Sequence, residues 1–167
     1  MTADPQPTPI GERLKAAFRS HPAGIAIITA ATGTGPVGLT ASSVASVAVD
    51  PAAIVFSVTR ATGSAGAILG AETFVVHLVD DEHTALAQSF AVSGADRFTA
   101  EQGWTALETG EPVLPTARAA LRCRALHSVV VGSSTVVIAE VLDVLLGDPG
   151  TPVVYLDREF HPIPRRR

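Results

Sequence analysis

The sequence predicts a mainly β domain: an antiparallel β-barrel with a few peripheral helices. Short runs of β-branched residues recur along most of the 167-residue chain, and Gly, Pro and Asp residues that favour turns separate them at close intervals. Helical periodicity is confined to a few short segments between these runs. The sequence lacks the regular alternation of strand and helix that marks a parallel doubly wound sheet. The length suits one domain.

The overall composition narrows the class of protein. Hydrophobic residues make up 47% of the chain and charged residues 17%, which predicts a folded core. The formal net charge of −4 argues against a nucleic-acid partner, which would require a basic face. No apolar run reaches the roughly 20 residues that a bilayer span needs, and residues 1–8 do not have the pattern of a secretion signal. We therefore expect a cytoplasmic protein without a membrane partner.

The first predicted element is a short amphipathic helix over residues 9–19. Pro9 suits the first helical turn, because that turn has no use for the missing N–H. Ile10, Leu14 and Phe18 then recur at helical spacing, and a His-Pro pair ends the run.

Extended segments account for most of the remaining chain. Asp50-Pro51 separates two of them, because proline cannot donate to a central ladder. Asp80 and Asp81 cap a second predicted helix, and one or two helical turns are expected over 64–69. The Gly-containing region 93–114 is expected to be irregular and to cover part of the domain. The predicted extended stretches are 24–29, 37–49, 52–58, 73–78, 119–131, 135–146 and 152–160.

The sequence gives no support for a dinucleotide fingerprint, a hydrolase or a metal site. Residues 33–38 match GxGxxG, but no helical spacing follows, so a hairpin turn explains these glycines better than a dinucleotide fingerprint does. No serine lies in a GxSxG elbow. Cys123 is expected to be an inert buried thiol. Because it is the only cysteine, an intrachain disulfide is excluded. The five histidines lack His-x-x-x-His spacing, so we predict no metal site.

A hydroxyl-rich segment is more informative. Thr40, Ser42, Ser43 and Ser46 place four hydroxyls within seven residues, interleaved with Ala and Val and without any charged residue. Hydroxyls and backbone N–H groups at a strand end can bind the carbonyl and phosphate oxygens of a ligand without a fixed charge. Composition alone leaves both a ligand role and a packing role open.

A second candidate lies just after the third extended stretch. Arg60 follows a predicted buried strand, and Thr62 and Ser64 precede a helical turn. Hydroxyls and an Arg beside a helix N-terminus suit a phosphate. Considered alone, these residues fit ordinary helix capping with a surface Arg better.

Taken in chain order, these segments resemble the flavin reductase-like family, from about Phe18 to Ile163. The hydroxyl-rich segment is part of GLTASSVASVAVDP at 38–51, which is similar to the family's most specific motif. One such segment alone would be weak support for the resemblance, whereas the series of segments in the same order is specific to the family. The other matching segments are FR with PAGIAIIT in 18–29, FVVHL at 74–78, LAQSFA at 86–91, RF with Trp104 in 97–104, and PVVY at 152–155.

The resemblance implies a fold and an activity. The expected fold is a six-stranded antiparallel FMN-binding split barrel of Greek-key type, assigned to residues 9–163, with a disordered tail over 1–8 and a basic tail over 164–167. The expected protein is a homodimer that transfers hydride from NADH or NADPH to FMN, or to FAD, and supplies reduced flavin to a monooxygenase. Because that chemistry belongs to the cofactor, no acid–base pair is required, and we assign no catalytic residue.

The resemblance also implies which residues bind the flavin. By this transfer Thr40, Ala41, Ser42 and Ser43 line the isoalloxazine and ribityl chain, Ser57, Arg60, Thr62 and Ser64 lie near the phosphate, and Arg97 and Phe98 lie near the nicotinamide.

The sequence departs from the family pattern at three places. Gly132-Ser133-Ser134 replaces a common Gly-Asp-His, His77 replaces a frequent Asn, and Leu156 replaces a frequent His. His77 or His127 could substitute for the lost groups, although packing and surface roles are the simpler expectation. The alternative function is therefore a flavin-binding module or electron carrier with little reductase activity. A pyridoxamine-phosphate-oxidase barrel is disfavoured, because residues 25–58 contain no Lys or Arg.

Overall fold

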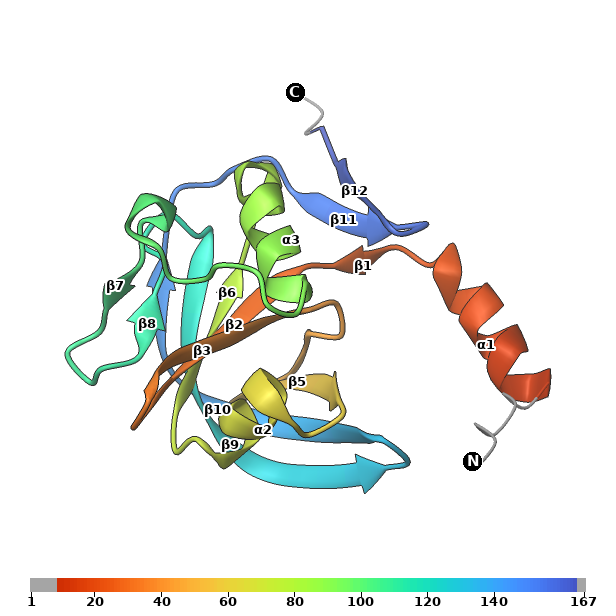
Figure 1. Ribbon diagram of the computed structural model, residues 1–167, viewed down its shortest axis with the longest axis horizontal. Helices are drawn as coiled ribbons and strands as arrows, with labels where there is room; N and C mark the ends of the chain where they lie inside the picture. The colour runs from red at the N-terminus through yellow and green to blue at the C-terminus, as the bar shows by residue number, and fades with distance from the viewer. Residues whose placement is uncertain (1–8, 165–167) are drawn as a thin grey trace.

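The structure is a computed structural model that describes residues 9–164; the predicted tail over 1–8 and the arginines 165–167 lie outside the described residues. An antiparallel sheet of seven strands forms the body of the molecule and curls around its core (Figure 1). Its strands are β2 (Ala26–Thr32), β3 (Gly35–Ala41), β4 (Ala45–Val49), β5 (Ala52–Thr59), β6 (Phe74–Leu78), β9 (Ala119–Val131) and β10 (Ser134–Leu146).

The strand order in this sheet is β3-β2-β6-β9-β10-β5-β4. Sequence neighbours form the hairpins β2–β3, β4–β5 and β9–β10, whereas β6 lies between β2 and β9 and β5 pairs with β10. Two smaller sheets are made of β1 (Ala23–Gly24), β11 (Val153–Leu156) and β12 (Glu159–Pro162), and of β7 (Thr105–Ala106) and β8 (Pro112–Val113). The helices are α1 (Pro9–Arg19), α2 (Gly63–Gly70), α3 (Thr84–Ala91) and the 3₁₀ turns η1 (Asp81–His83) and η2 (Ala100–Gln102).

The predicted mainly β, antiparallel class is confirmed, and two predicted stretches are wrong in detail. The stretch 37–49 breaks at 42–44 into β3 and β4, and the principal sheet has seven strands where six were expected. The stretch 152–160 folds back as the β11–β12 hairpin. Asp157 and Arg158 form its turn, with φ angles of 51° and 69° in the left-handed region. Aspartate is common in such turns, but Arg158 is not a residue that predicts a left-handed conformation from sequence.

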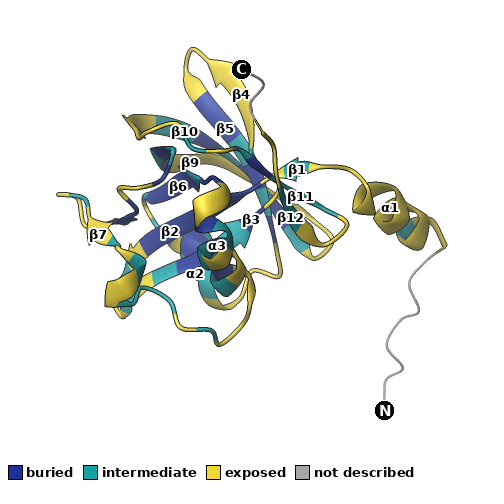
Figure 2. Ribbon diagram, turned by 90° about the horizontal axis from the view of Figure 1, so that it is seen from above, coloured by how far each residue is buried: buried dark blue, intermediate teal, exposed yellow. Residues whose placement is uncertain are grey.

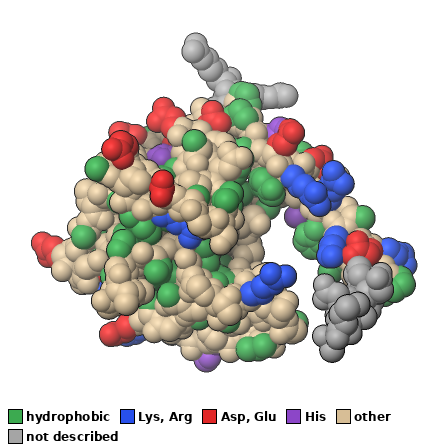
Figure 3. Space-filling view, viewed as in Figure 1, with side chains coloured by type: hydrophobic (Ala, Val, Ile, Leu, Met, Phe, Trp, Pro, Cys, Tyr) green, Lys and Arg blue, Asp and Glu red, His purple; other side chains and the backbone are tan. Residues whose placement is uncertain are grey.

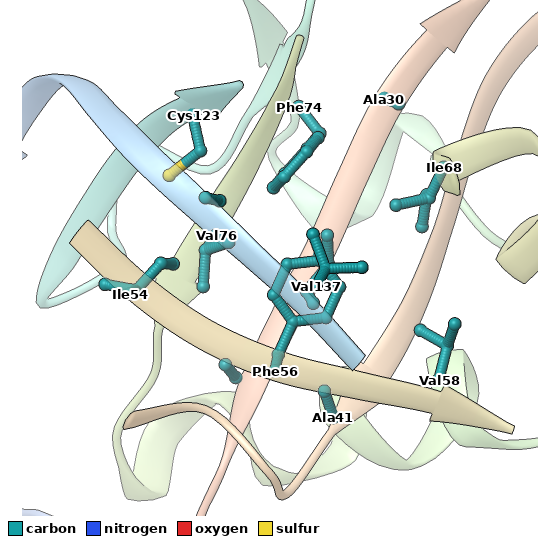
Figure 4. Packing of buried hydrophobic residues seen from close by; sticks show 13 residues of the cluster. Ala30, Ala41, Ile54, Phe56, Val58, Ile68, Phe74, Val76, Cys123 and Val137 are labelled. Carbon is teal, nitrogen blue, oxygen red and sulfur yellow. The ribbon is translucent and has the colours of Figure 1, made fainter. Parts of the chain in front are cut away.

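The core lies between the curled faces of the sheet and under α2 (Figure 4). Phe56 of β5 and Phe74 of β6 meet edge to face with ring centroids 5.5 Å apart, and Val76 and Val137 pack around them. The residues that line this core alternate with outward-facing residues along β5, which is the pattern of a half-buried strand.

A second buried cluster fixes α3 over β2 and β3. Phe90 of α3 packs with Ile27 of β2 and with Phe98 and Trp104 of the following loop. The helix approaches β3 so closely that a Cβ on Gly38 would lie 2.5 Å from Cε1 of Phe90. Only glycine fits at this position without displacing the ring.

Helix α1 stands apart from the barrel (Figure 2). Its predicted bounds are confirmed, but none of its residues is buried. Its apolar stripe remains exposed, at 75% for Ile10, 59% for Leu14 and 64% for Phe18. Among residues 9–164, no helix is long and apolar enough to cross a membrane.

Candidate functional site

A large hollow, which we call the α1 cleft, separates α1 from the barrel and has a volume of about 930 Å³ (Figure 3). One wall is the segment Ser42–Ala45 between β3 and β4. The opposite wall includes Lys15, Phe18 and Arg19 of α1, and Tyr155 and Arg158 of the β11–β12 hairpin. The hydroxyl-rich segment therefore faces a space large enough for a nucleotide-sized ligand.

A smaller hollow of about 330 Å³, which we call the inner hollow, adjoins this cleft. It is lined by Ile25, Thr40 and Phe160, among others. Ser42, Tyr155 and Arg158 line both spaces.

The cleft wall has backbone groups that the sheet does not use. The β2–β3 ladder ends at Ala41 and the β4–β5 ladder begins at Ala45, so residues 42–44 pair in neither. Ser43 holds the segment in place through its side chain: its Oγ accepts a hydrogen bond from the N–H of Ser57 at 2.9 Å and donates to the carbonyl of Ser57 at 3.1 Å. The segment is thus fixed to β5, while the backbone of its neighbours is left available to a ligand.

The other two residues of the predicted Thr40–Ser43 set have different surroundings. Thr40 donates from Oγ1 to the carbonyl of Ala87 in α3 at 2.5 Å, while its side chain also borders the inner hollow. Ala41 is buried, and its methyl group belongs to the main core, as Figure 4 shows. Ala41 can therefore offer a ligand only its backbone.

Arg97 points into the protein and ties three elements together. Its guanidinium donates to the carbonyl of Gly38 in β3 at 2.8 Å, to Oγ of Ser64 in α2 at 3.2 Å and to the carbonyl of Val92 after α3 at 2.7 Å. It also lies 5.5 Å from the ring centroid of Phe90. The structure thus brings Ser64 and Arg97 together, but neither lines the α1 cleft or the inner hollow.

Phe98 and the three remaining phosphate candidates, Ser57, Arg60 and Thr62, also lie outside both hollows. Phe98 packs on Trp104 with ring centroids 5.1 Å apart. Arg60 has a left-handed φ of 57°, and its N–H donates to the carbonyl of Ser133 at 2.8 Å. Thr62 precedes α2 with no hydrogen bond from its side chain to the helix. The divergent 132–134 segment therefore lies beside Arg60.

The buried histidine in β6 has a structural role. His77 is 0% exposed, its Nδ1 lies 3.0 Å from the carbonyl of Ile27, and its Nε2 accepts from the N–H of Leu114 at 3.2 Å. Since Nε2 accepts, the proton of the neutral ring is on Nδ1. Burial lowers the pKa of His77 to about 4, and the charge of His83 contributes to the lowering. The hydrogen bond to Ile27 acts in the opposite direction and raises the pKa.

Other titratable groups in the described residues also serve the fold. Burial raises the pKa of the Cys123 thiol to about 12, which agrees with the predicted inert role. His127 is exposed on β9. Within residues 9–164, no three His, Cys, Asp or Glu side chains are grouped so that they could hold a metal ion.

Glu111 is a buried carboxylate held by an ion pair. Its Oε1 lies 2.8 Å from Nε of Arg122, and it also accepts from the hydroxyls of Thr109 and Thr73. Burial alone would raise the pKa of Glu111, but the two threonine hydrogen bonds, its backbone and Arg122 outweigh it and lower the pKa to about 2. The pair links the 109–111 loop to β9.

Sequence reasoning missed the basic wall of the α1 cleft. Lys15, Arg19 and Arg158 line it, and of these three only Arg19 lies in a segment that matches the family pattern. The helical spacing of 15 and 19 was visible in the sequence, but nothing in the sequence placed Arg158 beside them.

Known proteins share this fold and sequence pattern. An NADH:FMN oxidoreductase of Rhodococcus qingshengii is 41% identical over 74% of this chain, and the match spans 65% of that relative's own length. The crystal structure of a flavin reductase domain protein from Arthrobacter sp. FB24 superposes with a TM-score of 0.85 at 29% identity, covering 93% of this chain and 98% of the other.

The styrene monooxygenase flavin reductase of Pseudomonas putida S12 gives a TM-score of 0.79 at 25% identity, over 92% of this chain and 99% of that one. The model of the flavin reductase like domain matches residues 18–164, which include both walls of the α1 cleft from Phe18 onward. With the fold, the hydroxyl-rich segment and this match in agreement, the chain belongs to the flavin reductase like domain family.

Proposed function

We propose that the protein is an NAD(P)H-dependent flavin reductase that binds FMN, or FAD, in the α1 cleft. The observation that carries the proposal is the segment 42–44. It lies in the motif most specific to the family, pairs in no ladder and forms one wall of a 930 Å³ cleft. The relative from Rhodococcus, named an NADH:FMN oxidoreductase, supports the same pair of substrates.

The groups on this wall fit a flavin. The ring system of a flavin presents carbonyl oxygens and ring nitrogens along one edge, and backbone N–H groups and hydroxyls are the donors that suit them. Ser42 supplies a hydroxyl at the junction of both hollows, and residues 42–44 supply unpaired backbone groups. For the phosphate, Arg60 and Thr62 stay predictions with side chains available, whereas the hydroxyl of Ser64 already accepts from Arg97.

The chain's own contribution to catalysis would be positioning. When bound, the flavin supplies the redox chemistry, since its ring accepts a hydride from the dihydronicotinamide. The protein holds the two rings in register and excludes water, which does not need a general acid or base. This agrees with a cleft whose hydroxyl wall carries no His, Asp or Glu.

We also propose a homodimer. An isolated helix of 11 residues is marginal in water, so α1 is expected to be covered on its apolar side. Ile10, Leu14 and Phe18 form that side, and the distal parts of β9 and β10 expose further valines and leucines. A second copy would bury both surfaces. Light scattering should give a dimer mass, and Leu14→Asp should reduce it to that of a monomer, whereas Arg13→Asp should not.

The reduced flavin would be used by a second enzyme. The structurally similar reductase from P. putida S12 is named as the flavin reductase of a styrene monooxygenase. We therefore propose a flavin-dependent monooxygenase as partner and a cytoplasmic location, where NAD(P)H is available.

A second function keeps some support from Gly132-Ser133-Ser134. These residues replace the family's Gly-Asp-His, and their hairpin turn lies beside Arg60 without any titratable side chain of its own. A flavin-binding module or electron carrier with little reductase activity would fit this loss.

One experiment separates these functions. FMN binding is measured by quenching of flavin fluorescence, and reduction by stopped-flow bleaching with NADH and with NADPH. Ser42→Trp fills the junction of the two hollows and should weaken FMN binding at least tenfold. Ser46→Trp, an exposed change on β4 outside both hollows, is the matched control. Tight FMN binding with bleaching no faster than that of free FMN would favour the carrier, and an unaffected Ser42→Trp would refute the proposed site.

A further inference from the structure

The two walls of the α1 cleft differ in charge. The hydroxyl wall, Ser42–Ala45, carries no cation, whereas Lys15, Arg19 and Arg158 line the opposite wall. Glu12 is the only carboxylate among the lining residues, and its Oε1 is already paired with Nζ of Lys15 at 2.9 Å. The cleft therefore has an excess of positive charge in a chain whose net charge is −4. Figure 3 shows Lys and Arg side chains beside this hollow.

The two arginines come from distant parts of the chain and are held together by their backbone. The N–H of Asp157 donates to the carbonyl of Arg19 at 3.0 Å, and the hydroxyl of Ser20 donates to Oδ1 of Asp157 at 3.1 Å. These bonds fasten the turn of the β11–β12 hairpin to the end of α1. Oδ1 of Asp157 is thereby paired with a hydroxyl, and Asp157 forms no ion pair with either arginine.

Both guanidinium groups are available to a ligand. Neither Arg19 nor Arg158 makes a side-chain hydrogen bond or ion pair with any residue in 9–164. Arg158 also lines the inner hollow, so its side chain stands where the two spaces meet, opposite Ser42. Two unpaired guanidiniums on one wall of a cleft suit an anion with several oxygens, because each can bind phosphate oxygens in a bidentate manner.

We propose that Arg19 and Arg158 bind the diphosphate of a dinucleotide substrate in the α1 cleft: either FAD, whose ring lies against Ser42, or NAD(P)H, whose ring stacks on the bound flavin. This proposal rests on the proposed flavin reductase function. The hydroxyl wall suits an uncharged ring system, and the basic wall suits a diphosphate bound in the same cleft. Both NAD(P)H and FAD carry a diphosphate, so the shared chemistry is a nucleoside diphosphate, and the experiment decides which molecule supplies it.

The test uses Arg19→Gln, Arg158→Gln and the double variant of the full chain. Arg13→Gln is the matched control, because Arg13 is an exposed arginine of the same helix that does not line the cleft. Calorimetry with ADP-ribose, which has the diphosphate but neither reacting ring, measures the site without any turnover. Wild type and Arg13→Gln should bind ADP-ribose alike, and the double variant should bind at least tenfold more weakly. The wild-type affinity should fall with added salt.

Turnover then identifies the source of the diphosphate. N-benzyl-dihydronicotinamide replaces NADH as the hydride donor in a parallel set of assays, because it has the same reacting ring but no phosphate. If NAD(P)H occupies the site, the double variant should raise the KM for NADH about tenfold with FMN and leave the rate with the benzyl reductant unchanged. If FAD occupies it, the KM for FAD should rise with the benzyl reductant and the KM for FMN should not.

The outcomes distinguish this proposal from the proposed function. Absence of ADP-ribose binding to wild type, or equal binding by the double variant, overturns the diphosphate site even if the protein reduces flavin. Equal loss with NADH and with the benzyl reductant, each paired with FMN and with FAD, would also overturn it, since that would indicate general damage. Conversely, specific ADP-ribose binding by a protein that reduces no flavin would refute the reductase and retain the site.

Discussion

His77 should make the stability of the fold depend on pH. The buried ring stays neutral because burial lowers its pKa from 6.5 to about 4, whereas in the unfolded chain it titrates normally. Between these two values the unfolded state binds the additional proton, so the free energy of unfolding falls as the pH falls. The contribution is complete above pH 6.5 and is progressively lost as the pH approaches 4.

The two pKa values fix the size of this effect. At pH 5 the unfolded ring is almost fully protonated and the folded ring is almost fully neutral, which lowers the free energy of unfolding by about 2 kcal/mol relative to pH 7. By pH 4 the loss reaches about 3 kcal/mol. Protonation would place a hydrogen on Nε2, which could then no longer accept from the N–H of Leu114, so the cost is expected to appear in global unfolding.

Urea unfolding at pH 7, 6 and 5 measures this term when wild type is compared with His77→Asn. Asparagine also offers one donor and one acceptor but does not titrate in this range. The difference in unfolding free energy between the two proteins should narrow by about 2 kcal/mol from pH 7 to pH 5. A difference that stays constant over this range would refute a buried neutral His77, whatever the absolute stability of the variant.

Three further substitutions test other parts of the structure by urea unfolding. Arg97→Met removes three hydrogen bonds and leaves two carbonyls unpaired, so it should lower the free energy of unfolding by about 2–4 kcal/mol. The control Arg124→Met should lower it by less than about 1 kcal/mol, because the ion pair of Arg124 is exposed. Similar losses in the two variants would contradict the role of Arg97 in holding three elements together. Gly38→Ala should cost about 1–3 kcal/mol through its clash with Phe90, and no loss would show that α3 moves away freely. Glu111→Gln should be less stable than wild type, and this difference should shrink as the pH falls from 4.5 towards 2, because Glu111 stabilises the fold only while its carboxylate is ionised. A difference that does not change with pH would contradict the ion pair with Arg122.

The sequence predicted elements better than it predicted their edges. The helix over 9–19, the strand over 119–131 and the hairpin at 33–38 all agree with the structure, because periodicity and turn residues determine them locally. The break at 42–44 was not predictable, since it depends on Ser43 replacing a backbone pairing with a side-chain bond to Ser57. That bond joins residues from neighbouring hairpins and has no signature in either segment.

The candidate site shows the same division between local and tertiary information. Ser42 and Ser43 drew attention because an uncharged run of hydroxyls is unusual on an exposed strand, and both line the α1 cleft; their contact with a flavin stays a prediction. Arg97 was assigned to the nicotinamide side from its place in a motif, yet its guanidinium is engaged by Gly38 and Val92. A residue that belongs to a family motif can contact the protein's own backbone as well as a ligand.

The basic wall of the cleft is a property of the assembled fold alone. Arg19 ends a helix and Arg158 occupies a turn 139 positions later, and the fastening of Asp157 to residues 19 and 20 is what places them on one surface. Lys15 and Arg19 of α1 line this cleft together with Phe18, whereas Ile10 and Leu14 of the apolar stripe do not. If a second copy covers that stripe, it also holds α1 in position, so dimer formation and diphosphate binding should be coupled. Leu14→Asp should then weaken ADP-ribose binding although Leu14 does not line the cleft, and undiminished binding by a monomeric Leu14→Asp protein would show that the backbone bonds at Asp157 suffice to hold the site.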